Sequence, residues 1–275
     1  MDFVISLGII SVAAGLLGSL VGLGGGIIIV PVLTLFYHVD IRLAIGASIL
    51  SVIATSSGAA VAYVRERLTN LRAGMFLEIA TTIGAITGAY ITTLVTGNIL
   101  FVLFALVLIY SAFAMFRKRH NDALLSESND RLANYFNLHG SYYDQNEHRE
   151  IAYKVSGTKL GLGLMYIAGL ISALLGVGSG ALKVPAMDMA MHIPIKASAA
   201  TSDFMIGVTA AASAGTYFAR GLINPVIAAP IAIGILIGAL IGSRLLNRFA
   251  SRYVQALFVI VLVVVAFEML QRGLS

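Results

Sequence analysis

The chain has 275 residues, of which 59% are hydrophobic and 11% are charged, and its mean hydropathy is +0.92. Because a soluble domain usually carries about 25% charged residues, this composition excludes an ordinary soluble protein and indicates a membrane protein. The absence of cysteine excludes a disulfide framework and a thiolate metal site. We attribute the net charge of +5 to basic residues at helix ends, and we expect no nucleic-acid partner.

Five hydrophobic elements are predicted in the first half of the chain, at residues 3–22, 27–37, 43–63, 73–95 and 99–116. A helix needs about 20 apolar residues to cross the hydrocarbon layer of a membrane. Apolar runs without polar alternation favour helices over a transmembrane β-barrel. The second element would rise only about 16 Å as a helix, so we expect a short broken or re-entrant helix there.

Residues 117–159 form the polar stretch of the chain, and we interpret them as a cytoplasmic linker between two transmembrane halves, 1–116 and 160–275. A solvated connector with one short helix is the favoured interpretation. The aromatic side chains of the linker could instead pack on the bundle or bind a partner. They are Tyr135, Phe136, Tyr142 and Tyr143.

Five further hydrophobic elements repeat the first five, at residues 160–176, 181–191, 197–218, 222–243 and 253–270. Residues 15–92 recur without a gap at a constant offset of 154, as from Gly22 to Gly176 (176 − 22). A duplicated hydrophobic unit, broken by glycines at the same place in each copy, is typical of secondary transporters. Inverted repeats would place most Lys and Arg residues in the cytoplasm and both termini outside, and the positive-inside rule favours them over parallel repeats.

Each copy carries a glycine turn directly before its short helix, the first at residues 22–26 and the second at residues 176–180. Glycine allows backbone conformations closed to other residues, and the first N–H groups of the following helix lack intrahelical partners. Two such helix starts facing each other in the membrane would bind an anion. The alternative role is close helix packing through small residues. The candidate substrate-binding positions in the turns are Gly22, Gly24, Gly25, Gly26, Gly176, Gly178, Ser179 and Gly180.

Lys183 lies in the second short helix, where its counterpart in the first half is Ile29. An ionisable residue at membrane depth is costly and marks a functional site by default, so we predict that Lys183 binds the anion. Snorkelling to the membrane interface is the alternative. Asp203 and Asp188 are the candidate ion-pair partners of Lys183, and Asp203 is also a candidate for proton coupling. Glu78 lies near the start of its predicted helix. A cytoplasmic position or a helix-capping role is as good an interpretation of Glu78 as a role in the membrane.

Small hydroxyl side chains line the third element of each half and complete the candidate substrate site. Ser48 recurs as Ser202, and Thr55 recurs as Thr209. Their hydroxyls could replace part of the hydration shell of an anion, or they could bond backbone carbonyls and bridge helices. We include Ser48, Thr55 and Ser202 among the candidate substrate-binding residues.

The duplicated stretch from the glycine turns to Pro31 and Pro185 resembles the sulfite exporter family called TauE/SafE. The resemblance extends over nearly the whole chain outside the linker. It implies a multi-helix plasma-membrane permease for sulfite, sulfonates such as sulfoacetate, or related oxyanions. The family's glycine and proline positions correspond to Gly22, Gly24, Gly25, Gly26, Pro31, Gly176, Gly178, Gly180 and Pro185. Ser179 departs from the glycine of the first copy and adds a hydroxyl.

The sequence as a whole predicts an all-α polytopic membrane protein with two inverted repeats of about five hydrophobic elements each. We expect a secondary transporter that moves a small anion across the plasma membrane by alternating access, with proton or ion coupling as an option. The alternatives are an anion channel and a non-transporting membrane subunit of a larger complex. No cofactor, metal or enzymatic activity is predicted. Membrane lipid surrounds the protein, and a homodimer is an open alternative.

Overall fold

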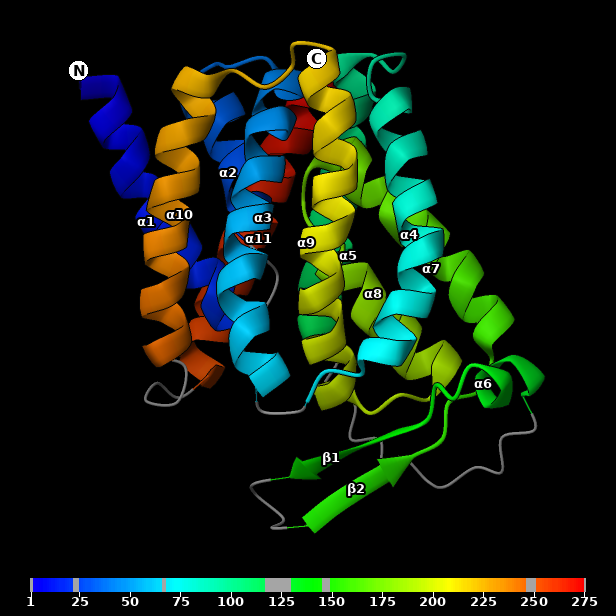
Figure 1. Ribbon diagram of the computed structural model, residues 1–275. Coiled ribbons are helices and arrows are strands. Elements are labelled where there is room, and N and C mark those ends of the chain that lie inside the picture. Colours follow the sequence, from blue (N-terminus) through cyan, green and yellow to red (C-terminus); the bar gives the residue numbers. More distant parts are fainter. Residues whose placement is uncertain are drawn as a thin grey trace.

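The computed structural model describes residues 2–21, 25–65, 68–116, 130–144, 149–245 and 251–274. The described part of the chain is a helical bundle with a small α/β linker at one end (Figure 1). The first half contains α1 (Asp2–Val21), α2 (Gly26–Pro31), the π-helix η1 (Val32–Phe36), α3 (Ile41–Arg65), α4 (Leu71–Ile91) and α5 (Gly97–Phe116). The second half contains α7 (Thr158–Leu175), α8 (Gly180–Pro185), the π-helix η2 (Ala186–Ala190), α9 (Ile195–Ala219), α10 (Pro225–Leu245) and α11 (Ser251–Leu274).

Three helices of the described residues are long and apolar enough to cross a membrane: α4, α7 and residues Pro225–Gly242 of α10. Shorter apolar stretches occur in α1, α3 and α5, and another joins α2 to η1. Large apolar side chains also cover the outside of the bundle, where Ile79, Phe113 and Ile233 are each at least 60% exposed. A continuous apolar exterior of this kind is suited to lipid rather than to water.

The short second element of each half is a continuous helical segment that changes from α to π geometry at a proline. Pro31 ends α2 and Pro185 ends α8, and each is followed directly by a π-helix. Proline has no N–H and crowds the preceding turn, which explains why the helix widens there. The segments Gly26–Phe36 and 180–190 correspond closely to the predicted short elements, and both are too short to span the hydrocarbon.

The two halves interlock through reciprocal glycine contacts, because α1 packs on α10 and α4 packs on α7. A Cβ on Gly15 would overlap the main-chain oxygen of Ile235, and a Cβ on Gly169 would overlap that of Thr81. Gly15 and Gly169 are equivalent positions of the repeat, and so are Thr81 and Ile235, because the members of each pair lie 154 positions apart (169 − 15 and 235 − 81). The same reciprocity relates Gly84 to Gly238 and Gly88 to Gly242. Close backbone approach at small residues is how membrane helices associate.

The linker folds into α6 (Arg131–Tyr135) and an antiparallel hairpin of β1 (Gly140–Asp144) and β2 (Arg149–Tyr153), with Gly140 opposite Tyr153. Tyr142 and Tyr153 are buried in a cluster that also contains residues of α4, α7 and α9. Much of the described linker is exposed, as a solvated connector would be, but Tyr142 and Tyr153 pack on the bundle, which was the alternative interpretation. Of the four aromatic side chains that the sequence singled out, Tyr142 is buried against the bundle, whereas Tyr135, Phe136 and Tyr143 are at least 47% exposed.

Asn70 joins the linker to the bundle at the start of α4. Its side-chain oxygen caps the helix by accepting from the amide of Ala73 at 3.0 Å, and its amide group donates to Leu138 O at 2.8 Å and Tyr153 Oη at 3.0 Å. The same residue thus satisfies a helix end and holds the linker in place. Burial raises the pKa of Tyr153, whose ring is buried at this contact.

Candidate functional site

The two glycine turns meet inside the bundle, where Gly26 lies against Gly176. A Cβ on Gly26 would be 2.6 Å from the main-chain oxygen of Gly176, so the approach requires glycine. Ser48 on α3 fastens the contact, because its hydroxyl donates to Gly176 O at 2.7 Å and lies 3.2 Å from Gly26 O. The turn of one half is thus held against the turn of the other. Gly22 and Gly24 lie outside the described residues.

The second glycine turn uses its glycines for backbone conformation. Gly176 and Gly178 have φ angles of +67° and +65°, in the left-handed region that favours glycine. Gly180 and Ala181 then begin α8, and their amides have no hydrogen-bond acceptor among the described residues. The Ser179 hydroxyl is buried and has no partner there either. This turn therefore presents two amides and one hydroxyl that are free to bind another group.

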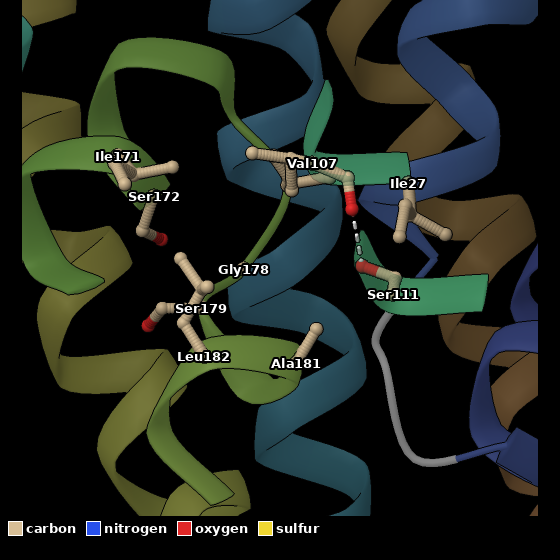
Figure 2. A pocket seen from close by; sticks show the side chains of 10 residues that line it. Ile27, Val107, Ser111, Ile171, Ser172, Gly178, Ser179, Ala181 and Leu182 are labelled. Carbon is tan, nitrogen blue, oxygen red and sulfur yellow. Dashed lines mark hydrogen bonds between the residues drawn. The ribbon is translucent and has the colours of Figure 1, made fainter. Parts of the chain in front are cut away.

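A narrow cavity adjoins the second glycine turn and is bordered by α5, α7 and α8 (Figure 2). Ser111 Oγ points to the main-chain oxygen of Val107, to which it donates at 2.7 Å (Figure 2). Ser179 also lines the cavity, and its hydroxyl has no partner among the described residues. The space inside accommodates about one water molecule, so an anion would fit only if the helices moved apart. The lining consists of Ile27, Val107, Ser111, Ile171, Ser172, Val177, Gly178, Ser179, Ala181 and Leu182.

A buried network of three side chains joins α4, α8 and α9, and we call Glu78, Lys183 and Thr209 the charge network. Lys183 Nζ donates to Thr209 Oγ1 at 2.6 Å and lies 3.9 Å from Glu78 Oε2. The Thr209 hydroxyl is 2.6 Å from Glu78 Oε1, to which it can donate. The Lys183 side chain is 0% exposed and the Glu78 side chain 6%. A lysine that snorkels to the interface is excluded by this burial.

The charge network leaves hydrogen-bonding capacity unused. Among the described residues Glu78 Oε2 has no hydrogen-bond partner, and Lys183 uses one of its three ammonium donors. The single hydroxyl hydrogen of Thr209 can go to Glu78 Oε1 or to Met205 O at 2.8 Å. Buried charges are costly unless they are both paired and hydrogen-bonded. The network therefore retains donors and an acceptor for one further polar group.

The carboxylate beside Lys183 belongs to Glu78, and not to Asp203 or Asp188 as the sequence led us to expect. Both aspartates are half-buried. Asp203 is positioned toward α3, where its main-chain oxygen accepts from Ser56 Oγ at 2.6 Å. The expectation relied on closeness along the chain, whereas the partner comes from the other half through the packing of α4 on α9.

The remaining candidate residues divide between packing and the charge network. Thr55 donates to Ser51 O of its own helix at 2.8 Å, whereas its duplicate Thr209 belongs to the charge network. Gly25 has an ordinary helical φ of −68°, and its carbonyl accepts from the amides of Ile28 and Ile29 in α2. Ser202 is buried without a partner among the described residues.

Comparison with known proteins shows the family of the chain. The family described as "Sulfite exporter TauE/SafE" matches residues 7–269. The chain belongs to this family. A "probable membrane transporter protein YunE" of Bacillus subtilis is 29% identical over 231 residues, which are 82% of this chain and 81% of the relative. A probable membrane transporter protein of Methanocaldococcus jannaschii is 25% identical over 207 residues, which are 73% of this chain and 67% of the relative. No solved structure matches the chain significantly.

Both glycine turns and the complete charge network fall within the region that matches the TauE/SafE family. Family and relatives together establish a membrane transporter and not an enzyme. With its several apolar helices, this TauE/SafE protein is a multi-pass membrane protein. A transporter of this kind acts on a small-molecule substrate within a membrane environment.

Proposed function

We propose that this TauE/SafE protein is a secondary transporter that moves a small anion, such as sulfite, a sulfonate or a related oxyanion, across the plasma membrane. The observation that carries the proposal is the fully buried ammonium of Lys183, which has ammonium donors to spare inside an apolar bundle. An ionisable residue at this depth is costly and belongs to a substrate or ion pathway. A positive charge with free N–H donors selects a negatively charged solute with several acceptor oxygens.

We place the anion between the second glycine turn and the charge network. The amides of Gly180 and Ala181 and the hydroxyl of Ser179 supply free donors on one side. Lys183, which follows on α8, supplies the charge. Backbone amides and a lysine together bind an oxyanion without a metal or cofactor.

We further propose that the two halves are inverted repeats that rock against each other. The reciprocal contacts of Gly15 and Gly169 support a two-fold relation between the halves. Both chain ends lie at one end of the bundle and the linker lies at the other (Figure 1), as expected if each half crosses the membrane an odd number of times. In such transporters the site lies at the repeat interface, and rocking exposes it to alternate sides. The cavity holds about one water molecule, which favours a carrier that must open over a standing pore.

Transport in proteoliposomes tests the proposal. The purified protein should release or accumulate labelled sulfite or methanesulfonate with saturable kinetics and counter-transport. Lys183→Ala should lower the flux by at least about tenfold, since a charge-assisted hydrogen bond is worth about 1.5–3 kcal/mol. Lys159→Ala, the same change at an exposed lysine, should transport as the wild type does.

Two results would overturn the proposed function. One is the absence of flux for every oxyanion tried with wild-type protein that elutes as a single folded species. The other is undiminished flux in a folded Lys183→Ala variant. Flux that does not saturate and shows no counter-transport would instead identify a channel.

A further inference from the structure

We propose that Glu78 is the proton-binding residue of the transport cycle, and that the anion binds at Lys183 together with one proton on Glu78. This inference rests on the proposed function and adds the coupling ion and the group that carries it. Asp203, which the sequence suggested for this role, does not lie in the charge network.

The geometry gives the two oxygens of Glu78 different tasks. Oε1 accepts from Thr209 at 2.6 Å and lies 3.4 Å from the hydroxyl of Thr82. Oε2 has no hydrogen-bond partner in the described part of the chain and lies 3.9 Å from Lys183 Nζ. A proton on Oε2 would leave the bonds to Oε1 in place. It would also turn an unused acceptor into a donor directed at the space beside the ammonium.

Charge balance then requires the proton to accompany the anion. With Lys183 protonated and Glu78 ionised, the buried pair is neutral. An anion entering alone would leave one net negative charge in the apolar bundle, and the Glu78 carboxylate would repel it. When a proton from the open aqueous side binds Glu78, Lys183 and the neutral carboxyl both donate to the anion, and the site remains neutral. Both the anion and the proton leave on the opposite side.

Among the described residues, the charged partner of the Glu78 carboxylate is Lys183. From α8 it faces Lys183, and from α9 it faces Thr209. On α4 itself, Thr81 donates to the main-chain oxygen of Glu78 at 3.1 Å. From α7, Gly169 packs at the same level of α4. The ionisable residues of α7 are Lys159, which is exposed, and Tyr166, which is 37% exposed. Among the described residues, no other charged side chain lies within ion-pair distance of this carboxylate.

The repeat shows that the proton site occurs once in the molecule. The counterparts of Glu78 and Lys183, offset by 154, are Ala232 and Ile29. Only Thr209 has a polar counterpart, Thr55, which bonds its own helix. The one carboxylate and one ammonium of the charge network predict one proton per monovalent anion and an electroneutral transport step.

The experiment uses wild-type protein in liposomes that contain a pH-sensitive dye, with methanesulfonate as the probe because its charge is constant between pH 5 and pH 8. We expect anion entry to acidify the interior and an imposed pH gradient to drive accumulation. Glu78→Gln, which imitates the protonated carboxyl, should keep anion counterflow while proton movement and gradient-driven accumulation are lost. Glu268→Gln, a matched change at an exposed position on α11, should remain coupled.

Three outcomes would overturn the assignment while leaving anion transport intact. The first is wild-type anion flux without proton movement, a measurement that needs no variant. The second is loss of coupling in Asp203→Asn with coupling retained in Glu78→Gln. The third is a folded Glu78→Gln protein that loses counterflow as well as coupling. If wild-type protein moves neither methanesulfonate nor sulfite, the proposed function fails first.

Discussion

The two halves of the protein share their helices and differ in their charges. Each half has a glycine turn, a short helix that widens at a proline, and a first helix that packs on the fourth helix of the other half. At the equivalent points of this scaffold the first half has Ile29, and the second half has Lys183. The partner of that lysine, Glu78, comes in turn from the first half. The duplicated sequence accounts for the shared arrangement of helices, and substitutions that differ between the halves account for the buried ion pair.

The same contrast applies to a single pair of duplicated threonines. Thr55 bonds the main chain of α3, as a hydroxyl in an apolar helix commonly does. Thr209 has the equivalent acceptor, Met205 O, at 2.8 Å, and its hydroxyl also contacts both members of the ion pair. One additional lysine has therefore turned a structural threonine into part of a polar site. The assignment can be challenged by making the second half resemble the first.

The largest effect is expected from Lys183→Ile, which places the first-half residue in the second half. It leaves the Glu78 carboxylate buried without its counter-charge, and breaking a buried pair in this way costs about 3–5 kcal/mol. We expect a large fall in the thermal unfolding midpoint in detergent and loss of anion flux.

The double variant Lys183→Ile/Glu78→Ala is the control, because it reproduces the uncharged pair of the first half. Replacing a buried ion pair by apolar side chains is often neutral, so the double variant should regain most of the lost stability. It should remain inactive in flux assays. A double variant that is less stable than Lys183→Ile would contradict the cost assigned to the unpaired Glu78 carboxylate.

A smaller effect is expected from the glycines that hold the halves together. Gly169→Ala would drive a methyl group into the main chain of α4 at Thr81, and overpacking of this kind costs about 1–3 kcal/mol. Gly163→Ala on the same helix meets nothing within 4 Å and should leave the unfolding midpoint unchanged or raise it. If the contacts are reciprocal, Gly15→Ala should destabilise the protein to a similar extent as Gly169→Ala. Equal midpoints for the two α7 variants would contradict the packing.

Much of the scaffold could be predicted from the sequence because its signals are local and repeated. The short helices after the glycine turns were expected at residues 27–37 and 181–191 and occur within one residue of those bounds. Lys183 could be singled out because a lone lysine among apolar residues is conspicuous. Its partner could not be found in this way, because Glu78 lies 105 positions earlier (183 − 78) and reaches the site through packing between the halves.

The packing of the linker on the bundle could not be predicted from the sequence either. Its many charged and polar residues predicted a solvated connector, yet Tyr142 and Tyr153 are buried against the bundle. Composition averages over the segment and does not register a few well-placed aromatic residues. The contact depends on Asn70 and on Asp130, whose partners lie elsewhere in the sequence.

The smallest effect concerns Asp130, which attaches the linker to the second half at a point with no counterpart in the first. Partial burial opposes ionisation, but hydrogen bonds from Thr158, Ala133 and Leu132 lower the pKa of Asp130 below its usual value. A lowered pKa means that this contact stabilises the linker fully above the unfolded-state value of about 3.9 and is lost as the pH falls through the folded value. Asp130→Ala should cost about 1 kcal/mol through loss of the helix cap, and Asp130→Asn, which can still cap, should cost less. Amide hydrogen exchange near pH 7 should become faster in α6 and at the start of α7 in the alanine variant, while α1 exchanges as in the wild type. Faster exchange in α1 as well would mean that the linker stabilises both halves.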